Sequence, residues 1–157
     1  MNNVLIVDTD NENIENLISI LDISNWKLSI LDSGEKCVDS IKSGNCPDAI
    51  ILGMQLVDMS GLDLIEKIRD DSDVPVIIFS NDKELYTLVK AFDSGADDYM
   101  VFPVNEAIFM ARLKALLRRR DWNFQIGNGN DRNESNQNRV SKVLLAKSLN
   151  EVHQPQM

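Results

Sequence analysis

Short runs of apolar side chains alternate with longer segments of helical periodicity over the first 120 residues. Consecutive apolar residues predict four buried strands, and a weaker alternating pattern predicts a fifth. These strands cover residues 4–7, 27–31, 49–52, 74–79 and 99–102, the second being the weaker one. Apolar residues spaced three or four apart predict an amphipathic helix after each strand. The apolar positions of these helices fall within residues 14–21, 37–41, 62–68, 85–92 and 108–117.

This order amounts to five strand-then-helix units in about 120 residues. Strands that are apolar on both faces and separated by helices favour a parallel sheet covered on both sides. Right-handed crossover connections then favour a doubly wound α/β sandwich. In such a fold, ligand chemistry lies where the strands end, near the switch in strand order. Gly95 is expected to form the C-terminal cap of the fourth helix.

The composition changes after residue 120, and we divide the chain there. Residues 1–120 are expected to form one domain. Residues 121–139 are rich in asparagine and poor in apolar side chains, which predicts a linker or a disordered stretch. Residues 140–157 are expected to hold a short amphipathic helix and a tail, with apolar side chains at positions 140, 144, 145, 149 and 152. A helix this short is marginal by itself.

Charge and composition narrow the class of protein. The formal net charge of −9 is carried by residues 1–120, so this domain is a poor nucleic-acid binder and any DNA contact is expected to be indirect. The basic run at 118–120 complements a helix dipole. The two cysteines and one histidine lack the spacing of a disulfide framework or a zinc site, which fits a reducing cytoplasm. We find no signal peptide and no apolar run long enough to cross a membrane.

The residues that follow the predicted strands are the candidates for a site. They are Asp8, Thr9 and Asp10 after the first strand, Gly53 after the third, Ser80 after the fourth, and Phe102 and Pro103 at the fifth. Four stretches carry a family resemblance: residues 4–8 (VLIVD), 47–52 (PDAIIL), 58–62 (DMSGL) and 95–99 (GADDY). In this order they resemble the response-regulator receiver domain of bacterial two-component signalling, over residues 3–119. The last stretch, Pro103 and the helix at 111–119 are similar to the branch that contains winged-helix transcription factors.

The resemblance implies a flavodoxin-like fold, with a five-stranded parallel sheet in the order 2-1-3-4-5 and helices on both faces. It also implies a phosphorylation site. In the family, two acids after strand one hold Mg²⁺, and an aspartate after strand three accepts the phosphoryl group. A serine or threonine and a lysine bind the phosphoryl oxygens. An aromatic side chain on strand five rotates to report the event.

This chain matches that pattern only in part. Three positions match it: Ser80 and Tyr99 as the switch pair, and Pro103. Three depart from it: Gly53 at the acceptor position, Phe102 at the lysine position, and Thr9 beside Asp8 in the acid pair. Asp10 is a partial substitute for the lost acid. We therefore expect no aspartyl phosphorylation, no enzymatic activity, and weak Mg²⁺ binding or none.

Several of these positions also have a purely structural interpretation. A tight turn between strand and loop would explain Gly53, and packing in the core would explain Phe102. Asp8 either accepts hydrogen bonds from nearby backbone N–H groups or keeps a weak cation site. Tyr99 is either a switch residue or an ordinary half-buried strand aromatic. The loss of charged groups also relieves repulsion and desolvation, which would fix the pocket in one state.

The winged-helix branch pairs through a surface made by the fourth helix, the fifth strand and the fifth helix. By resemblance, two of its ion pairs are kept here: Asp93 with Lys114, and Asp98 with Arg112. Leu88 and Ile108 replace the third pair. Buried aliphatic side chains contribute roughly 1.5–3 kcal/mol each, against ~0–1 kcal/mol for an exposed ion pair. The substitution favours a homodimer that forms without phosphorylation, unless Leu88 and Ile108 turn inward to their own core.

We therefore expect an atypical receiver that acts in transcription regulation through constitutive dimerisation or contacts with another regulator or output domain. The alternative is a ligand- or partner-gated adaptor that uses the altered pocket around Gly53, Phe102 and Asp8. Flavin binding is disfavoured, because the acidic segment after the first strand would repel a phosphate. Too few residues follow position 120 to form a winged-helix output domain.

Overall fold

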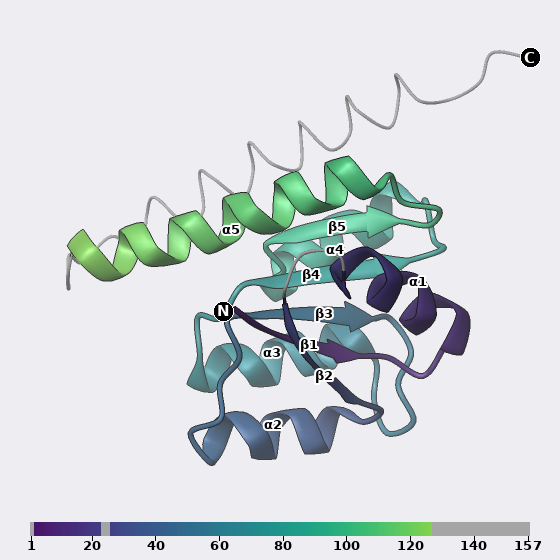
Figure 1. The fold of residues 1–157 in the computed structure, drawn as a ribbon. Coiled ribbons are helices and arrows are strands. Elements are labelled where there is room, and N and C mark those ends of the chain that lie inside the picture. The colour runs from purple at the N-terminus through teal and green to yellow at the C-terminus, as the bar shows by residue number, and fades with distance from the viewer. Residues whose placement is uncertain (1, 23–25, 127–157) are drawn as a thin grey trace, which may run out of the picture.

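Our computed structural model describes residues 2–22 and 26–126. These residues form one five-stranded parallel sheet in the order β2-β1-β3-β4-β5, and along the chain a helix follows each strand (Figure 1). The strands are β1 (Asn3–Val7), β2 (Lys27–Leu31), β3 (Ala49–Gly53), β4 (Val76–Ser80) and β5 (Asp98–Val101). The helices are α1 (Asn11–Asp22), α2 (Gly34–Lys42), α3 (Gly61–Asp71), α4 (Leu85–Ser94) and α5 (Glu106–Ile126). The predicted fold and strand order are confirmed.

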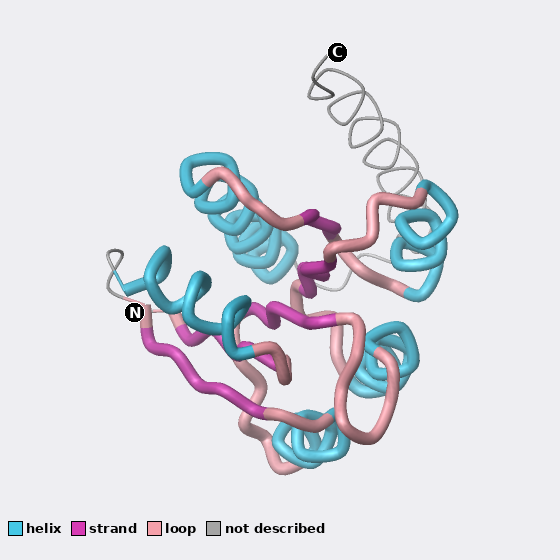
Figure 2. Tube along the Cα trace, turned by 90° about the vertical axis from the view of Figure 1, so that its right-hand side faces the viewer, coloured by secondary structure: helices cyan, strands magenta, loops and turns pink. Residues whose placement is uncertain are grey.

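Helices cover both faces of the sheet, as Figure 2 shows in a view turned by 90°. One hydrophobic cluster joins the sheet to α2, α3 and α4, and a second joins it to α1 and α5. Side chains alternate between the two clusters along each strand, so Ile50 and Leu52 of β3 face the first while Ile51 faces the second. The central strands β3 and β4 are buried at every position, which explains their continuous apolar runs.

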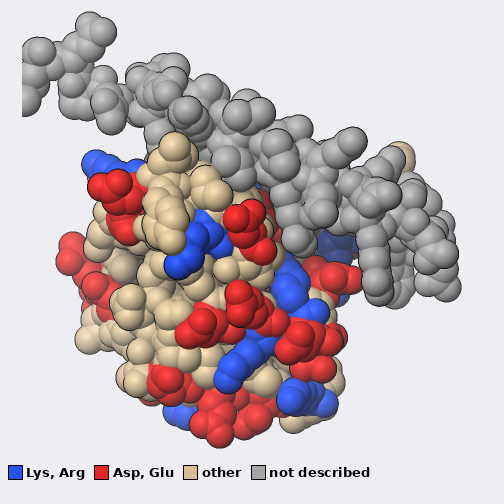
Figure 3. All heavy atoms as spheres, turned by 180° about the vertical axis from the view of Figure 1, so that it is seen from behind, with Lys and Arg blue, Asp and Glu red and all other residues tan. Residues whose placement is uncertain are grey.

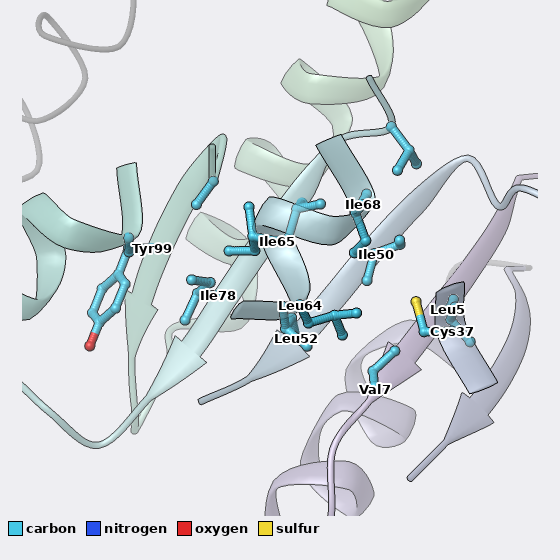
Figure 4. Packing of buried hydrophobic residues seen from close by; sticks show 14 of the residues in the cluster. Leu5, Val7, Cys37, Ile50, Leu52, Leu64, Ile65, Ile68, Ile78 and Tyr99 are labelled. Atoms are coloured by element: carbon cyan, nitrogen blue, oxygen red, sulfur yellow. The ribbon is translucent and has the colours of Figure 1, made fainter. Parts of the chain in front are cut away.

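The first cluster is drawn in Figure 4, where side chains of β1, β3 and β4 point toward those of α2 and α3. Leu64, Ile65 and Ile68 of α3 lie in it at helical spacing, all 1% exposed or less. In the second cluster, Phe109 of α5 meets Phe79 of β4 edge-to-face, with ring centroids 5.3 Å apart. The core therefore holds the carboxyl ends of the strands in fixed relative positions.

Local sequence signals account for several helix ends. Ser33 and Ser60 cap the amino ends of α2 and α3, because each hydroxyl accepts a hydrogen bond from a backbone N–H in the first turn. Gly95 ends α4 in the left-handed conformation, with a φ of 117°, so the predicted glycine cap is confirmed.

The last helix departs from the predicted boundary at residue 120. It continues to Ile126, six residues into the segment predicted as a linker. No glycine or proline interrupts the sequence before Gly127, so nothing in the local chemistry ends the helix sooner. The remainder of the predicted linker, to residue 139, and the predicted short helix and tail at 140–157 lie outside the described residues. Among the described residues, no helix has the length and apolar character needed to cross a membrane.

Candidate functional site

The residues predicted for the site meet at the end of the sheet where the carboxyl ends of the strands lie. Parallel pairing aligns the carboxyl ends of neighbouring strands: Val7 lies opposite Leu52, Gly53 opposite Phe79, and Ser80 opposite Val101. The loops that follow β1, β3, β4 and β5 therefore start side by side. The arrangement agrees with the general rule that sites in such sheets lie beyond the strand ends.

Asp8 fills the space above Gly53. Its side chain is 5% exposed, and Oδ1 accepts hydrogen bonds from the backbone N–H groups of Thr9 and Asp10, at 2.7 and 3.1 Å. A methyl group placed on Gly53 would lie 2.6 Å from the carboxylate carbon of Asp8. A Cβ atom almost never lies that close to a nonbonded carbon, so any side chain at position 53 must displace this carboxylate.

Gly53 is not a turn residue. It is the last residue of β3, pairs with Phe79 of β4, and lies outside the left-handed region that glycine alone enters easily. The tight-turn interpretation of Gly53 is therefore wrong. What excludes a side chain here is the carboxylate of Asp8, which directly follows the neighbouring strand β1.

A second contact joins the first and third loops. The Thr9 hydroxyl donates a hydrogen bond of 3.2 Å to the backbone carbonyl of Gln55. Mg²⁺ prefers several hard oxygen ligands in near-octahedral geometry. Here Oδ1 of Asp8 already accepts hydrogen bonds from two backbone N–H groups, and position 9 carries a hydroxyl in place of a carboxylate. Among residues 2–22 and 26–126, no three acidic, histidine or cysteine side chains are grouped so that they could hold a metal ion. These residues do not fit a Mg²⁺ site.

The predicted switch residues, Ser80 and Tyr99, are both buried. Tyr99 is 3% exposed, and its hydroxyl donates a hydrogen bond of 2.8 Å to the backbone carbonyl of Asp82. The Ser80 hydroxyl accepts from the backbone N–H of Asp82 at 3.0 Å. Burial raises the pKa of Tyr99, a hydrogen bond with Ser80 partly offsets this effect, and the charge of Asp82 adds to it. Both side chains are thus held by the loop after β4.

We expect Tyr99 to ionise above the ordinary pH range of tyrosine. Because its pKa is raised by folding, the associated stability is complete below the unfolded pKa and is lost as pH rises through the folded pKa. The chain has two tyrosines, so Tyr86→Phe leaves Tyr99 as the only reporter for an ultraviolet titration of phenolate. Ser80→Ala in that background removes the hydrogen bond that lowers the pKa, and should move the midpoint higher. A midpoint at or below that of a model tyrosine peptide would contradict the buried position.

Phe102 is packed rather than directed at the pocket. Its ring lies 4.9 Å from that of Phe79, and it packs against the cluster formed with α1 and α5. The peptide bond between Phe102 and Pro103 is cis, and Pro103 itself is exposed. The core-packing interpretation of Phe102 is confirmed, and this position offers no charge to an anion.

Sequence reasoning missed the role of Asp58. Its two carboxylate oxygens accept hydrogen bonds from the backbone N–H groups of Gly34 and Glu35, at 2.9 and 3.0 Å, at the start of α2. These bonds lower the pKa of Asp58. The residue ties the loop after β3 to α2, across 24 positions of sequence. The only signal for this role in the sequence was an acidic residue in a loop, with no partner for its carboxylate nearby along the chain.

The residues predicted for a dimer lie on α4, β5 and α5, which we call the α4–β5–α5 face. The prediction that Leu88 lies at the dimer interface is wrong. Leu88 is 4% exposed and packs in its own core beside Ala91 and Phe92, because positions 88, 91 and 92 share the inner side of α4. Ile108 does not turn inward and is 40% exposed. Asp93 and Lys114 are exposed. Asp98 and Arg112 form an ion pair within the chain, at 3.5 Å.

Known proteins share this architecture. Residues 4–114 match the response regulator receiver domain. The chain is 34% identical over 120 residues to the response regulator ArlR of Staphylococcus haemolyticus, covering 76% of this chain and 54% of that protein. It is 36% identical over 118 residues to the transcriptional regulatory protein PrrA of Mycobacterium tuberculosis, covering 74% and 50%. A crystal structure of a two-component response regulator from Clostridium difficile superposes with a TM-score of 0.70 at 32% identity, covering 76% and 98%. The chain spans about half the length of the curated relatives it matches.

Proposed function

Because the chain belongs to the response regulator receiver domain family, we propose that it is a two-component receiver that signals without aspartyl phosphorylation. The main support is the carboxylate of Asp8, which takes the space above Gly53. In the proposal, position 53 is the acceptor position of the family. A glycine has no nucleophile, and the Asp8 carboxylate occupies the space into which a side chain at position 53 would extend.

The other parts of the pocket also lack phosphoryl chemistry. Ser80 is not an activated nucleophile, because its hydroxyl oxygen accepts a hydrogen bond from the N–H of Asp82 and the contacts described here include no base. Phe102 offers a packed aromatic ring where the family uses a lysine, so developing phosphoryl charge would have no cation there. The domain therefore holds one state instead of switching between two.

Two hydrogen bonds support the idea of a fixed state. Thr9 joins the loops after β1 and β3 through Gln55, and Tyr99 is kept inside by the carbonyl of Asp82. A tyrosine that rotated outward would give up this bond and expose a buried ring, which costs on the order of 2 kcal/mol or more. We infer that Tyr99 remains in its buried rotamer in the working protein.

The output of this fixed state is pairing through the α4–β5–α5 face. Ile108 offers an aliphatic side chain at the start of α5, and burying it against a second copy would contribute roughly 1.5–3 kcal/mol. Asp93 and Lys114 are exposed and can pair across the interface for ~0–1 kcal/mol. Asp98 and Arg112 would have to exchange an internal ion pair for an external one, so we assign them no net contribution.

We place this receiver in transcription regulation, through a partner. The matched relatives include a transcriptional regulatory protein about twice as long as the matched region. The acidic receiver is a poor DNA ligand, so its contact with DNA would run through another regulator or an output domain. Gating by a small ligand in the pocket has less support, because Asp8 occupies the position that such a ligand would need.

Sedimentation equilibrium tests both parts of the proposal. The full chain is expected to be a dimer without Mg²⁺ or phosphodonor, with an unchanged dissociation constant after addition of Mg²⁺ and acetyl phosphate. Ile108→Glu should make it monomeric, since the charge would be buried at the interface. Ile30→Glu is the matched control, because Ile30 is 45% exposed on β2, at the opposite edge of the sheet.

Different results count against different parts. A monomer under all conditions would reject pairing, and a dimer that tightens with the phosphodonor would reject phosphorylation independence. Equal loss of the dimer in both isoleucine variants would place the interface elsewhere. Leu88→Glu is unsuitable for this test, because a charge at that buried position would unfold the core.

A further inference from the structure

The loop between β4 and α4, residues 81–84, is tied to the helix by the side chain of Asp82. Its carboxylate accepts two hydrogen bonds, one at Oδ1 from the backbone N–H of Glu84 at 2.8 Å and one at Oδ2 from the hydroxyl of Thr87 at 2.7 Å. Glu84 directly precedes α4, and Thr87 lies in its first turn. Asp82 therefore fixes the loop to the start of the helix.

This carboxylate compensates for a weak helix start. Glu84 is at the N-cap position of α4, and its own side chain makes no capping hydrogen bond. An acidic group near the first turn is favoured by the helix dipole. The bonds from Glu84 and Thr87 lower the pKa of Asp82, so the carboxylate is charged at neutral pH and continues to accept both bonds.

The backbone of the same residue contacts both predicted switch residues. The Asp82 N–H donates to the hydroxyl oxygen of Ser80 at 3.0 Å, and the Asp82 carbonyl accepts from the hydroxyl of Tyr99 at 2.8 Å. Ser80 and Tyr99 are both buried, at 8% and 3% exposed. Because all four bonds meet at one residue, the position of the first turn of α4 is coupled to that of Tyr99. We call these four bonds the Asp82 latch.

Tyr99 is the side chain that this coupling affects most. Its ring packs in the hydrophobic cluster that includes Leu88 and Phe92 of α4, while its hydroxyl bonds to the Asp82 carbonyl. A loop that moved away from β5 would take this carbonyl partner from a buried hydroxyl. The loss would favour rotation of the ring toward water, where the hydroxyl can be hydrated.

Charge alone does not distinguish Asp82 from other acidic residues of the domain. On the side of the molecule opposite to that in Figure 1, acidic side chains are spread among basic ones (Figure 3). A charge in such exposed surroundings usually gains little from its neighbours. The carboxylate of Asp82 differs in its place in the fold, because two donors of its own chain hold it next to the predicted switch residues.

We propose that Asp82 is the positioning residue that holds Ser80 and Tyr99 in their buried arrangement, in place of a phosphoryl group. The inference rests on the proposed function, because it explains how a single state is held without phosphorylation. Loss of the carboxylate frees the loop from α4, and the carbonyl that retains Tyr99 moves with the loop. The state of the receiver is thus set by a side chain of its own.

Fluorine NMR of Tyr99 tests this role. 3-Fluorotyrosine is incorporated into the full chain in a Tyr86→Phe background, where Tyr99 is the only tyrosine. A soluble gadolinium chelate enhances the relaxation of nuclei that reach water, so it measures the exposure of this ring. The parent signal should be protected. Asp82→Ala should raise the relaxation enhancement about fivefold, the factor expected when one hydrogen bond no longer favours the buried rotamer.

Glu84→Ala is the matched control. It removes the same charge from the same loop, in a side chain without a capping bond, and should leave the relaxation enhancement unchanged. Asp82→Asn keeps one oxygen that accepts hydrogen bonds, so it should give an intermediate value. If Asp82→Ala does not fold, Thr87→Val removes one donor to the carboxylate and should also expose Tyr99. Thr87→Ser restores the hydroxyl and should restore the protection.

The outcomes separate this inference from the proposed function. Equal protection of Tyr99 in the parent and in Asp82→Ala would overturn the Asp82 latch, as would equal exposure in Asp82→Ala and Glu84→Ala. A parent fluorine signal that shifts after addition of Mg²⁺ and acetyl phosphate would reject phosphorylation independence. The comparison of variants without phosphodonor would still decide whether Asp82 holds Tyr99.

Discussion

Gly53→Asp is expected to lower the free energy of unfolding by roughly 2–4 kcal/mol and still to accept no phosphoryl group from acetyl phosphate. The new side chain must push the Asp8 carboxylate away from the N–H groups of Thr9 and Asp10. Two carboxylates would then share one buried space. Phosphorylation should remain absent because the positions of Thr9 and Phe102 still lack an acid and a lysine. Urea denaturation and intact-mass measurement check the two parts.

The loss of stability should depend on pH. Two carboxylates in one buried space repel each other only while both are charged, so the loss of stability should be smaller at pH 5 than at pH 7. Adding Asp8→Ala should recover more than ~1 kcal/mol, as a double-mutant cycle would show. A Gly53→Asp protein as stable as the parent, or one that becomes phosphorylated, would reject the filled pocket.

Arg69→Met is expected to cost about 3–5 kcal/mol of unfolding free energy. The Arg69 guanidinium, on a side chain 15% exposed, donates to the carbonyls of Gly95, Ser72 and Val74 and to the carboxylate of Asp97. It thereby ties the end of α3 to the turn before β4 and to the turn before β5, which carries Tyr99. Removal leaves three buried or partly buried carbonyls and a carboxylate without this donor.

Two variants calibrate that result. Arg69→Lys keeps the charge near Asp97 but cannot reach all four acceptors with a planar fork, so it should retain less than half of the contribution. Lys67→Met changes an exposed cation on the same helix and should alter stability by no more than ~0.5 kcal/mol. Urea denaturation measures all three. An Arg69→Met protein within ~1 kcal/mol of the parent would show that water replaces these contacts easily.

The sequence by itself determined the fold and the place of the site. Continuous apolar runs such as residues 49–52 must be covered on both faces, and in a chain where helices alternate with the strands this requirement favours a parallel sheet. The site follows from the fold, because parallel strands bring their carboxyl ends to one edge. Gly95 was also predictable, since a left-handed residue at a helix end is usually glycine. These are local or periodic properties, and they do not depend on which side chains meet.

The tertiary structure decided what each residue at that edge does. Whether Gly53 is a turn residue or a position without room for a side chain depended on Asp8. This residue directly follows the neighbouring strand β1, and its carboxylate enters the space that a side chain would take. Leu88 turned inward because α4 rotates to bury positions 88, 91 and 92, a choice that helical spacing alone leaves open. Asp58 found its partners at the start of α2, and Arg69 found its partners on two separate turns. Such contacts join positions far apart in the chain, so only packing of the whole domain selects them.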